Sequence, residues 1–212
     1  QSNENLWFAG GNNLWIQHAR GEYILLMNND TWVEENFLGC FLRTFQESSL
    51  DVLWAREICY DEDLVNNDSE TSIHVPIIDF FGHHIYIDTP LNKGDTINTI
   101  AFYASGVCVI CKKDFYISTG GLDSDFFMYF EEVDWMWRIH LYGWKIWQAT
   151  NVFIHHAMAW STGWNGIKYK VFLWRNQNTL QMILKNYSWY NLIWVIPIYI
   201  SINMVEIFAF TL

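Results

Sequence analysis

The stretch EYILLMNND, residues 22–30, decides which fold class the chain suggests. Its apolar run is typical of a buried strand, and the strand would end in three polar side chains. Residues 10–20 precede it and predict a short helix after a glycine turn. Residues 34–46 follow it with apolar side chains at helical spacing, which indicates an amphipathic helix. A strand between two helices is the first sign of an α/β sheet.

The alternation continues beyond this stretch. Residues 61–100 are polar and rich in Asn and Asp, and we expect an irregular insertion there with a single hairpin. The later strand candidates resemble a hairpin, so the sheet should be mixed and flanked by helices. The further elements that we predict are strands at 51–60, 100–111, 144–148 and 152–155, and helices at 113–118 and 130–141.

Composition narrows the classes of function. The chain has 212 residues, of which 51% are apolar and 17% are charged, as in a globular protein. Its formal net charge of -11 argues against nucleic acid or an anionic membrane surface as the main partner. Cys108 and Cys111 have C-x-x-C spacing, but a strand would point them to opposite faces, so we expect reduced core cysteines.

The last 24 residues, 189–212, differ from the rest because they are almost wholly apolar. Their length could span a bilayer, whereas Asn191, Pro197, Asn203 and Glu206 weaken that interpretation. Three alternatives stay open: an interfacial or re-entrant membrane helix, a spanning helix, and a buried core helix. We therefore divide the chain into a domain at 1–180 and a hydrophobic segment at 181–212.

The stretch YFEEVDWMWR, residues 129–138, places three acids among aromatic side chains. On a helix, Glu131 and Asp134 share a face and Glu132 points about 100° away, so the three cannot all serve one site. Asp134 could pair with Arg138, four residues on. One interpretation is a solvated acidic first turn. The other is a desolvated carboxylate whose raised pKa suits a general base.

The polar end of the first strand also has two interpretations. Asn28, Asn29 and Asp30 could cap the following helix. Alternatively, Asp30 could bind Mg²⁺ or Mn²⁺ together with phosphate oxygens of a ligand, because α/β folds bind ligands at the carboxyl ends of strands. His155 and His156 follow a strand-like run, so at most one of them points into a given site.

The order of these motifs resembles that of family 2 glycosyltransferases of the GT-A fold, particularly the rhamnosyltransferase-like group. The resemblance covers residues 3 to about 178. ENLWFAGGNN is similar to the family's ENxGFAGGNN, NND to its D-x-D, and EEVD to its ED motif. ASGVCVI and GGLDSDFFMYF resemble the acceptor-side segment. The family's chain begins upstream with two strand–helix units for the nucleotide, so about 60 residues are expected to be missing here.

The resemblance implies roles for individual residues. Glu132 stands where the catalytic Asp usually lies, with Glu131 and Asp134 beside it, and Asp30 and His155 (alternatively His156) would bind Mn²⁺ or Mg²⁺. The implied donor-binding residues are Gly10, Gly11, Asn12, Asn13, Asn28 and Asn29. The implied acceptor-side residues are Ser105, Gly106, Gly121, Asp123 and Trp135.

The implied reaction is an inverting transfer of a sugar from a nucleoside diphosphate sugar to a hydroxyl of a glycan or lipid-linked glycan. It would serve surface polysaccharide synthesis at the cytoplasmic face of the membrane, with peripheral membrane association and no nucleic acid partner. Two rivals come from other classes. One is a non-catalytic carbohydrate-binding or remnant protein, and the other is a glycoside hydrolase with paired carboxylates.

Overall fold

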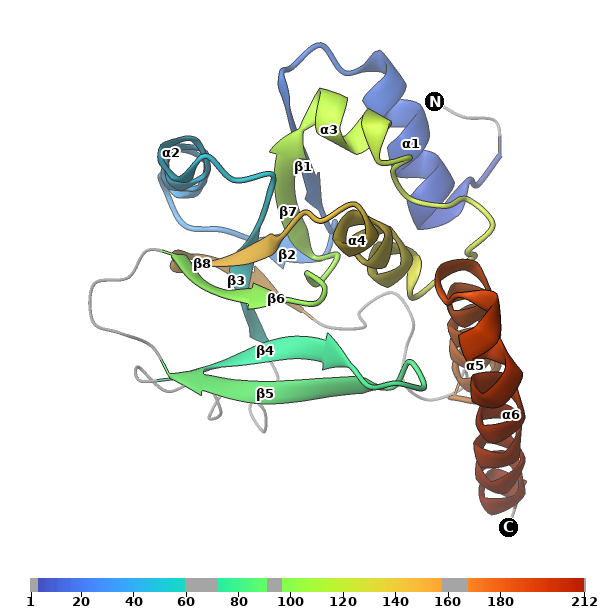
Figure 1. The fold of residues 1–212 in the computed structure, drawn as a ribbon. Coiled ribbons are helices and arrows are strands. Elements are labelled where there is room, and N and C mark those ends of the chain that lie inside the picture. The colour runs from blue at the N-terminus through green and yellow to red at the C-terminus, as the bar shows by residue number, and fades with distance from the viewer. Residues whose placement is uncertain (1–3, 60–71, 91–96, 158–167, 212) are drawn as a thin grey trace.

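A mixed sheet forms the centre of the computed structural model, which describes residues 4–59, 72–90, 97–157 and 168–211 (Figure 1). A short strand β6 (Ile97–Ala101) pairs with the edge of β8 beside β2. The order of the other strands is β1 (Tyr23–Met27), β7 (Cys108–Lys112), β3 (Val52–Cys59), β8 (Ile146–His156) and β2 (Thr31–Trp32).

The directions of the strands determine which strand ends lie along the same edge of the sheet. β1 runs antiparallel to β7, β7 antiparallel to β3, and β3 parallel to β8. β1, β3 and β8 therefore point the same way, and their carboxyl ends share one edge of the sheet. The mixed α/β fold predicted from the sequence is confirmed.

Helices cover both faces of this sheet (Figure 1). α1 (Trp7–His18), α3 (Lys113–Ser118) and α4 (Glu131–Leu141) pack on one face, and α2 (Phe37–Ser48) packs on the other. Side chains alternate along each strand, so the sheet contributes to a hydrophobic core on each face. Cys111 belongs to the core under α1, α3 and α4, and Cys108 belongs to the core under α2. Both thiols are free and buried, and burial raises the pKa of each to about 12, as suits core cysteines.

Several predicted elements need correction. Residues 100–111 do not form one strand, because the chain turns between β6 and β7 at Gly106 and Val107. The two strands predicted at 144–148 and 152–155 are the single strand β8. The N-terminal helix begins at Trp7, so Gly10 and Gly11 lie inside it and do not form a turn.

The insertion contains the predicted hairpin. Its strands are β4 (Ser72–Ile78) and β5 (His84–Pro90), which pair antiparallel from Ser72 opposite Pro90 to Ile78 opposite His84. Residues 60–71 and 91–96 of the predicted insertion lie outside the described residues. The hairpin forms a second, two-stranded sheet beside the main one.

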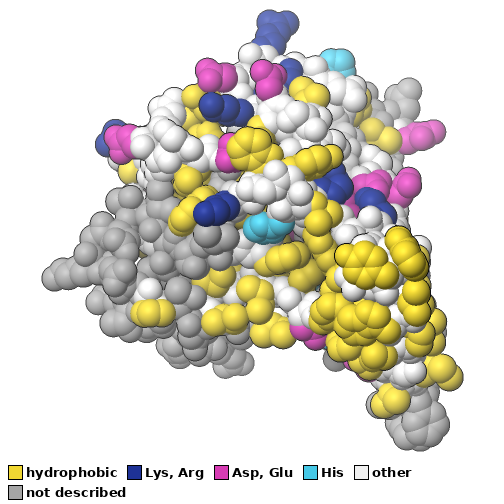
Figure 2. Space-filling model, viewed as in Figure 1, with side chains coloured by type: hydrophobic (Ala, Val, Ile, Leu, Met, Phe, Trp, Pro, Cys, Tyr) yellow, Lys and Arg dark blue, Asp and Glu magenta, His cyan; other side chains and the backbone are white. Residues whose placement is uncertain are grey.

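Two long helices end the described chain. α5 (Lys168–Asn186) crosses the predicted boundary at residue 180, and α6 (Trp189–Thr211) packs on it through Val195 and Tyr199. Much of α6 is apolar and exposed, as the yellow side chains over it in Figure 2 show, so it is not a buried core helix. Across the described parts of the chain, we find no helix whose length and hydropathy suit a membrane span.

Candidate functional site

Three polar side chains meet at the carboxyl ends of the three strands that point the same way. Asp30 follows β1, Glu57 lies near the end of β3, and His156 ends β8. The short β2 brings Asp30 against β8, because Thr31 pairs with His156 and the Ala157 N–H donates to the Asp30 carbonyl at 3.0 Å. This is the edge where open α/β sheets bind ligands.

His156 lies between the two carboxylates. Its Nδ1 is 2.5 Å from Glu57 Oε1, and its Nε2 is 3.2 Å from Asp30 Oδ1. Burial opposes protonation of this ring, but the carboxylates of Glu57 and Asp30 outweigh burial and raise the pKa of His156. In a neutral ring, Glu57 favours the tautomer with the proton on Nδ1, which leaves Nε2 unprotonated.

His155 lies on the other face of β8, as alternation along a strand requires. Its ring stacks on Trp32 with the centroids 5.3 Å apart, and its Nε2 is 3.7 Å from Glu34 Oε1. The histidine beside Asp30 is therefore His156, the alternative in the sequence interpretation, and not His155.

The donor set suits a divalent cation bound partly by its ligand. In the described ranges, no group of three or more His, Cys, Asp or Glu side chains is arranged to hold a metal ion. Asp30 and His156 supply one oxygen and one nitrogen, 3.2 Å apart. Two ligands of one octahedral ion, each at about 2.1 Å and at a right angle, lie roughly 3.0 Å apart. Because Mg²⁺ and Mn²⁺ sites often rely on substrate phosphates for further ligands, these residues fit such an ion.

Glu131 and Glu132, the acid pair at the start of α4, lie next to the sheet edge that carries Asp30 and His156. The Asn28 N–H donates to the Val107 carbonyl at 2.9 Å, which joins the NND turn to the turn between β6 and β7. Gly106 in that turn packs on Glu132, since a Cβ added to the glycine would lie 3.5 Å from Glu132 Cγ. One of the predicted acceptor-side residues, Gly106, is thus brought to the predicted catalytic residue, and Ser105 precedes it in the chain.

Glu131 and Glu132 are unusual carboxylates. Glu131 is 7% exposed, and its Oε2 contacts no hydrogen-bond donor among the described residues. Burial raises the pKa of Glu131, and burial together with the charge of Glu131 raises the pKa of Glu132. Glu132 is the more exposed of the two, so it can reach a ligand while remaining partly desolvated. A carboxyl in this state suits proton transfer near neutral pH.

Asp134 has a different role from its neighbours. It is fully buried and accepts hydrogen bonds from Arg138 Nε at 3.0 Å, Lys185 Nζ at 2.9 Å and Asn186 Nδ2 at 2.9 Å. The pairing of Asp134 with Arg138 is confirmed. With its oxygens occupied in the interior, Asp134 is a structural carboxylate and not the catalytic residue that the motif implied.

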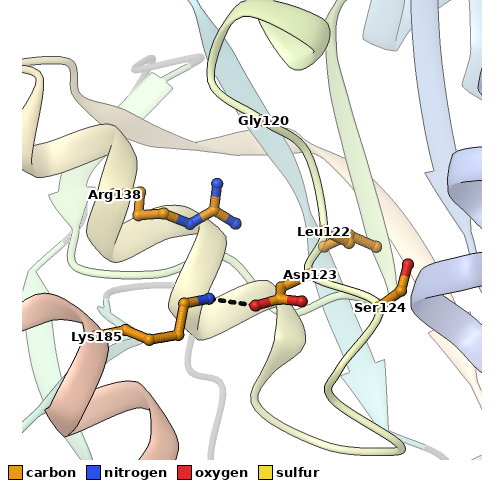
Figure 3. Close-up of a pocket in the computed structure, with 6 residues that line it drawn as sticks. All are labelled: Gly120, Leu122, Asp123, Ser124, Arg138 and Lys185. Carbon is orange, nitrogen blue, oxygen red and sulfur yellow. Dashed lines mark hydrogen bonds and ion pairs between the residues drawn. The ribbon is translucent and has the colours of Figure 1, made fainter.

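Two other predicted acceptor-side residues belong to this structural network. Figure 3 shows Lys185 reaching Asp123, which lines a hollow together with Arg138. Arg138 also donates to the carbonyls of Thr119 and Gly121. Arg138 and Lys185, the two cations of the hollow, are thus both engaged in internal contacts. Through these contacts Gly121 and Asp123 hold the GGLD turn in place. The remaining hollow-lining residues are Gly120, Leu122 and Ser124.

Trp135 and Asn13 also make internal contacts. Trp135 has no exposed surface and donates from Nε1 to Thr119 Oγ1 at 2.9 Å, so it cannot contact an acceptor. Asn13 donates to the Leu122 carbonyl at 2.7 Å and accepts from the Tyr116 hydroxyl at 2.6 Å. It therefore ties α1 to the GGLD turn.

The other predicted donor residues lie in two places. Asn12 donates to the Phe8 carbonyl within α1, and Gly11 has open space around it. Gly10 faces Leu6 and Ser124. Asn28 and Asn29 lie in the turn after β1, beside Asp30. The structure thus brings the NND turn to the acid pair and leaves the GGNN residues within a helix.

Two residues that the sequence did not point to lie at the candidate site. Glu57 supports His156, and His84 packs its ring against Phe130, the residue before Glu131, at 4.5 Å between centroids. The Tyr103 hydroxyl lies 2.9 Å from His84 Nδ1. Burial, with the charges of Arg175 and His83, lowers the pKa of His84 to about 4, so the ring is neutral. Only contacts between segments far apart in the chain could have revealed these residues.

Comparisons with known proteins identify the family and similar folds. Residues 1–120 match the model of the glycosyl transferase family 2. The fold is similar to GalNAc-T7 crystallised with UDP, GalNAc and Mn²⁺, with a TM-score of 0.61, 12% identity and coverage of 86% of this chain and 35% of that chain. No curated protein matches in sequence.

A second structure has a similar fold. It is the mannosyltransferase PcManGT from Pyrobaculum calidifontis in complex with GDP-Man and Mn²⁺, with a TM-score of 0.54, 14% identity and coverage of 87% of this chain and 44% of that chain. The present chain therefore spans less than half the length of either protein.

The raised pKa values predict how stability depends on pH. A glutamate whose pKa is higher in the folded chain keeps a proton that the unfolded chain has released, so the free energy of unfolding falls as pH rises from about 5 towards 8. Glu131→Gln removes one such group, and the decline should become shallower by up to about 1.4 kcal/mol per pH unit. Urea unfolding at pH 5, 6, 7 and 8 measures this slope.

The exposed Glu22 supplies the matched control. Glu22→Gln should leave the slope unchanged. A Glu131→Gln curve parallel to that of the parent chain would contradict the prediction, because it would mean that Glu131 titrates alike in the folded and unfolded chains.

Proposed function

The chain belongs to glycosyl transferase family 2, whose model matches more than half of it, and from this premise we propose that it transfers a sugar from a nucleoside diphosphate sugar to an acceptor hydroxyl. The order of its motifs further supports a place in the rhamnosyltransferase-like group and in surface polysaccharide synthesis. The observation that carries the proposal is the partly desolvated Glu132 beside the edge that holds Asp30 and His156.

Glu132 is the proposed general base. Its carboxylate accepts the proton of the acceptor hydroxyl while the hydroxyl oxygen forms a bond to the anomeric carbon of the donor. The bond between that carbon and the diphosphate oxygen breaks on the opposite face, so the configuration inverts and the nucleoside diphosphate leaves. Partial desolvation of Glu132 makes it a stronger base for an alcohol than a solvated glutamate would be.

Asp30 and His156 are the proposed ligands of Mn²⁺ or Mg²⁺. A divalent cation bound there would offset the negative charge of the leaving diphosphate. Glu57 would hold the His156 ring with Nε2 towards the ion, as carboxylates behind metal-bound histidines commonly do. Asn28 and Asn29, in the same turn as Asp30, would border the diphosphate.

The C-terminal helix supports a further proposal, that the chain associates peripherally with the cytoplasmic face of a membrane and there finds a glycan or lipid-linked glycan acceptor. Apolar side chains of α6 are exposed from Trp189, at 74%, to Val205, at 68%. A helix that is apolar on all sides needs a cover, and tryptophan and tyrosine at its start suit the headgroup region. Because the chain is acidic, zwitterionic lipid is the appropriate surface.

A transfer assay tests the proposed base. The chain is incubated with Mn²⁺, sugar alcohols as acceptors, and UDP-, GDP- and dTDP-sugars in turn. Glu132→Gln should lower kcat at least about 100-fold, the usual contribution of general base catalysis, while donor affinity persists. Glu131→Gln is the matched variant and should lower kcat less. The reverse order would assign the base role to Glu131, and donor binding without transfer in the parent chain would favour a carbohydrate-binding protein.

Mn²⁺ binding tests the proposed ligands. His156→Ala should weaken Mn²⁺ affinity at least about tenfold, measured by electron paramagnetic resonance of free Mn²⁺ with GDP present. His155→Ala is the adjacent control on the other face of β8 and should bind as the parent chain does. Loss of affinity in His155→Ala alone would restore the original motif assignment.

Flotation with phosphatidylcholine vesicles tests the proposed membrane contact. The double substitution Trp189→Glu and Ile193→Glu removes two exposed apolar side chains of α6, and it should lower the bound fraction about tenfold or more. Leu141→Glu, at an equally exposed position on α4, should bind as the parent chain does. Equal flotation of the two variants would contradict a role for α6.

A further inference from the structure

The chain takes a strained path immediately before the acid pair. Tyr129 and Phe130 have φ angles of 74° and 72°, two consecutive left-handed residues. Glycine adopts this region freely, whereas a large aromatic residue does so only when its surroundings hold it there. Some contact must therefore maintain this turn.

Asn178 on α5 supplies that contact. Its Nδ2 donates to the Met128 carbonyl at 2.8 Å and to the Tyr129 carbonyl at 2.7 Å. The side chain is 3% exposed. A primary amide has two N–H donors, so the two carbonyls use its full donor capacity. An aspartate of the same shape would have no donor and would place a negative charge against both carbonyls.

The Phe130 side chain is held as well. It is 4% exposed, the ring of His84 meets it edge-on at 4.5 Å, and the Arg175 guanidinium lies 5.9 Å from its centroid. The turn is thus fixed through its backbone by Asn178 and through this ring by the hairpin and α5.

The direction of the acids depends on this turn. Phe130 is the N-cap of α4, and its carbonyl accepts the Asp134 N–H at 2.9 Å to close the first helical turn. Glu131 and Glu132 are the first two residues of that turn. A change of φ at Tyr129 or Phe130 would rotate both carboxylates relative to Gly106 and to the strand ends.

We propose that Asn178 is a positioning residue: by holding the left-handed turn at Tyr129 and Phe130, it orients Glu132 towards the acceptor and keeps Glu131 buried beside it. The inference rests on the proposed function for its catalytic consequence, and on the geometry alone for its structural one. Asn178 itself contacts no substrate in this scheme, so its loss should affect the chemical step more than donor binding.

The first test measures kinetics. Asn178→Asp keeps the shape and removes both donors, and it should lower kcat at least tenfold while the KM for the donor changes less than twofold. The acid limb of the kcat–pH profile should move to lower pH, because Glu132 gains water when the turn relaxes. Unchanged kcat and pH profile in a folded Asn178→Asp chain would overturn the proposal.

The second test does not depend on activity. Carbon-13 NMR of labelled glutamate follows the carboxyl carbons of Glu131 and Glu132, and their titration midpoints should move towards ordinary values in Asn178→Asp. Midpoints equal to those of the parent chain would overturn the proposal even if no donor is ever turned over. Failure of the parent chain in every transfer assay would count against the proposed function only.

Two further variants keep the tests decisive. Asn178→Ser retains one donor, and if Asn178→Asp does not fold by circular dichroism, the same outcomes are read from the serine variant. Asn203→Ala is the matched control, because Asn203 is also a buried asparagine but donates within its own helix, to the Tyr199 carbonyl. A fall in kcat as large in Asn203→Ala as in the Asn178 variants would overturn a specific role for Asn178.

Discussion

The buried carboxylate of Asp134 is the interaction on which the arrangement of the site depends. Asp134 is fully buried and binds Arg138 on its own helix and Lys185 and Asn186 on α5. Arg138 continues to the carbonyls of the GGLD turn. This carboxylate thus links α4 to α5, some fifty residues later, and through Arg138 to the GGLD turn, so α4 cannot shift without breaking these contacts.

The fold could be predicted from the sequence wherever local periodicity decided it. Helix 113–118 follows directly from apolar spacing and from the glycines that end the helix. The sheet is mixed for another reason than the predicted hairpin, because β7 runs antiparallel to β1 and β3. The prediction failed where pairing across the sheet decided the structure. β8 is continuous because β3 pairs with it from Ile146 to His156, and β6 separates from β7 because the chain turns at Gly106 and Val107. Neither fact is visible in a window of one segment.

The candidate site, like the fold, could be predicted only where residue type and local position decided it. Asp30 at a strand end and the acids of α4 could be identified from residue type and position. The choice of His156 over His155 depends on the register that pairs His156 with Thr31. The support from Glu57 depends on the parallel pairing of β3 with β8. The contact of Asn178 with a turn some fifty residues earlier could not be foreseen from either segment.

The three acids of one helical turn differ because of the partners that the fold supplies to each. Two cations and an amide neutralise Asp134, so it remains buried. Glu131 has an oxygen with no donor among the described residues, and Glu132 lies beside Glu131 and a glycine. Keeping these two desolvated lowers stability as the pH rises, and a strained turn is needed to aim them. Such a cost is typical of functional sites, where selection for activity opposes selection for stability. The aromatic surroundings of this acidic turn therefore agree better with a chemical role than with a solvated helix start.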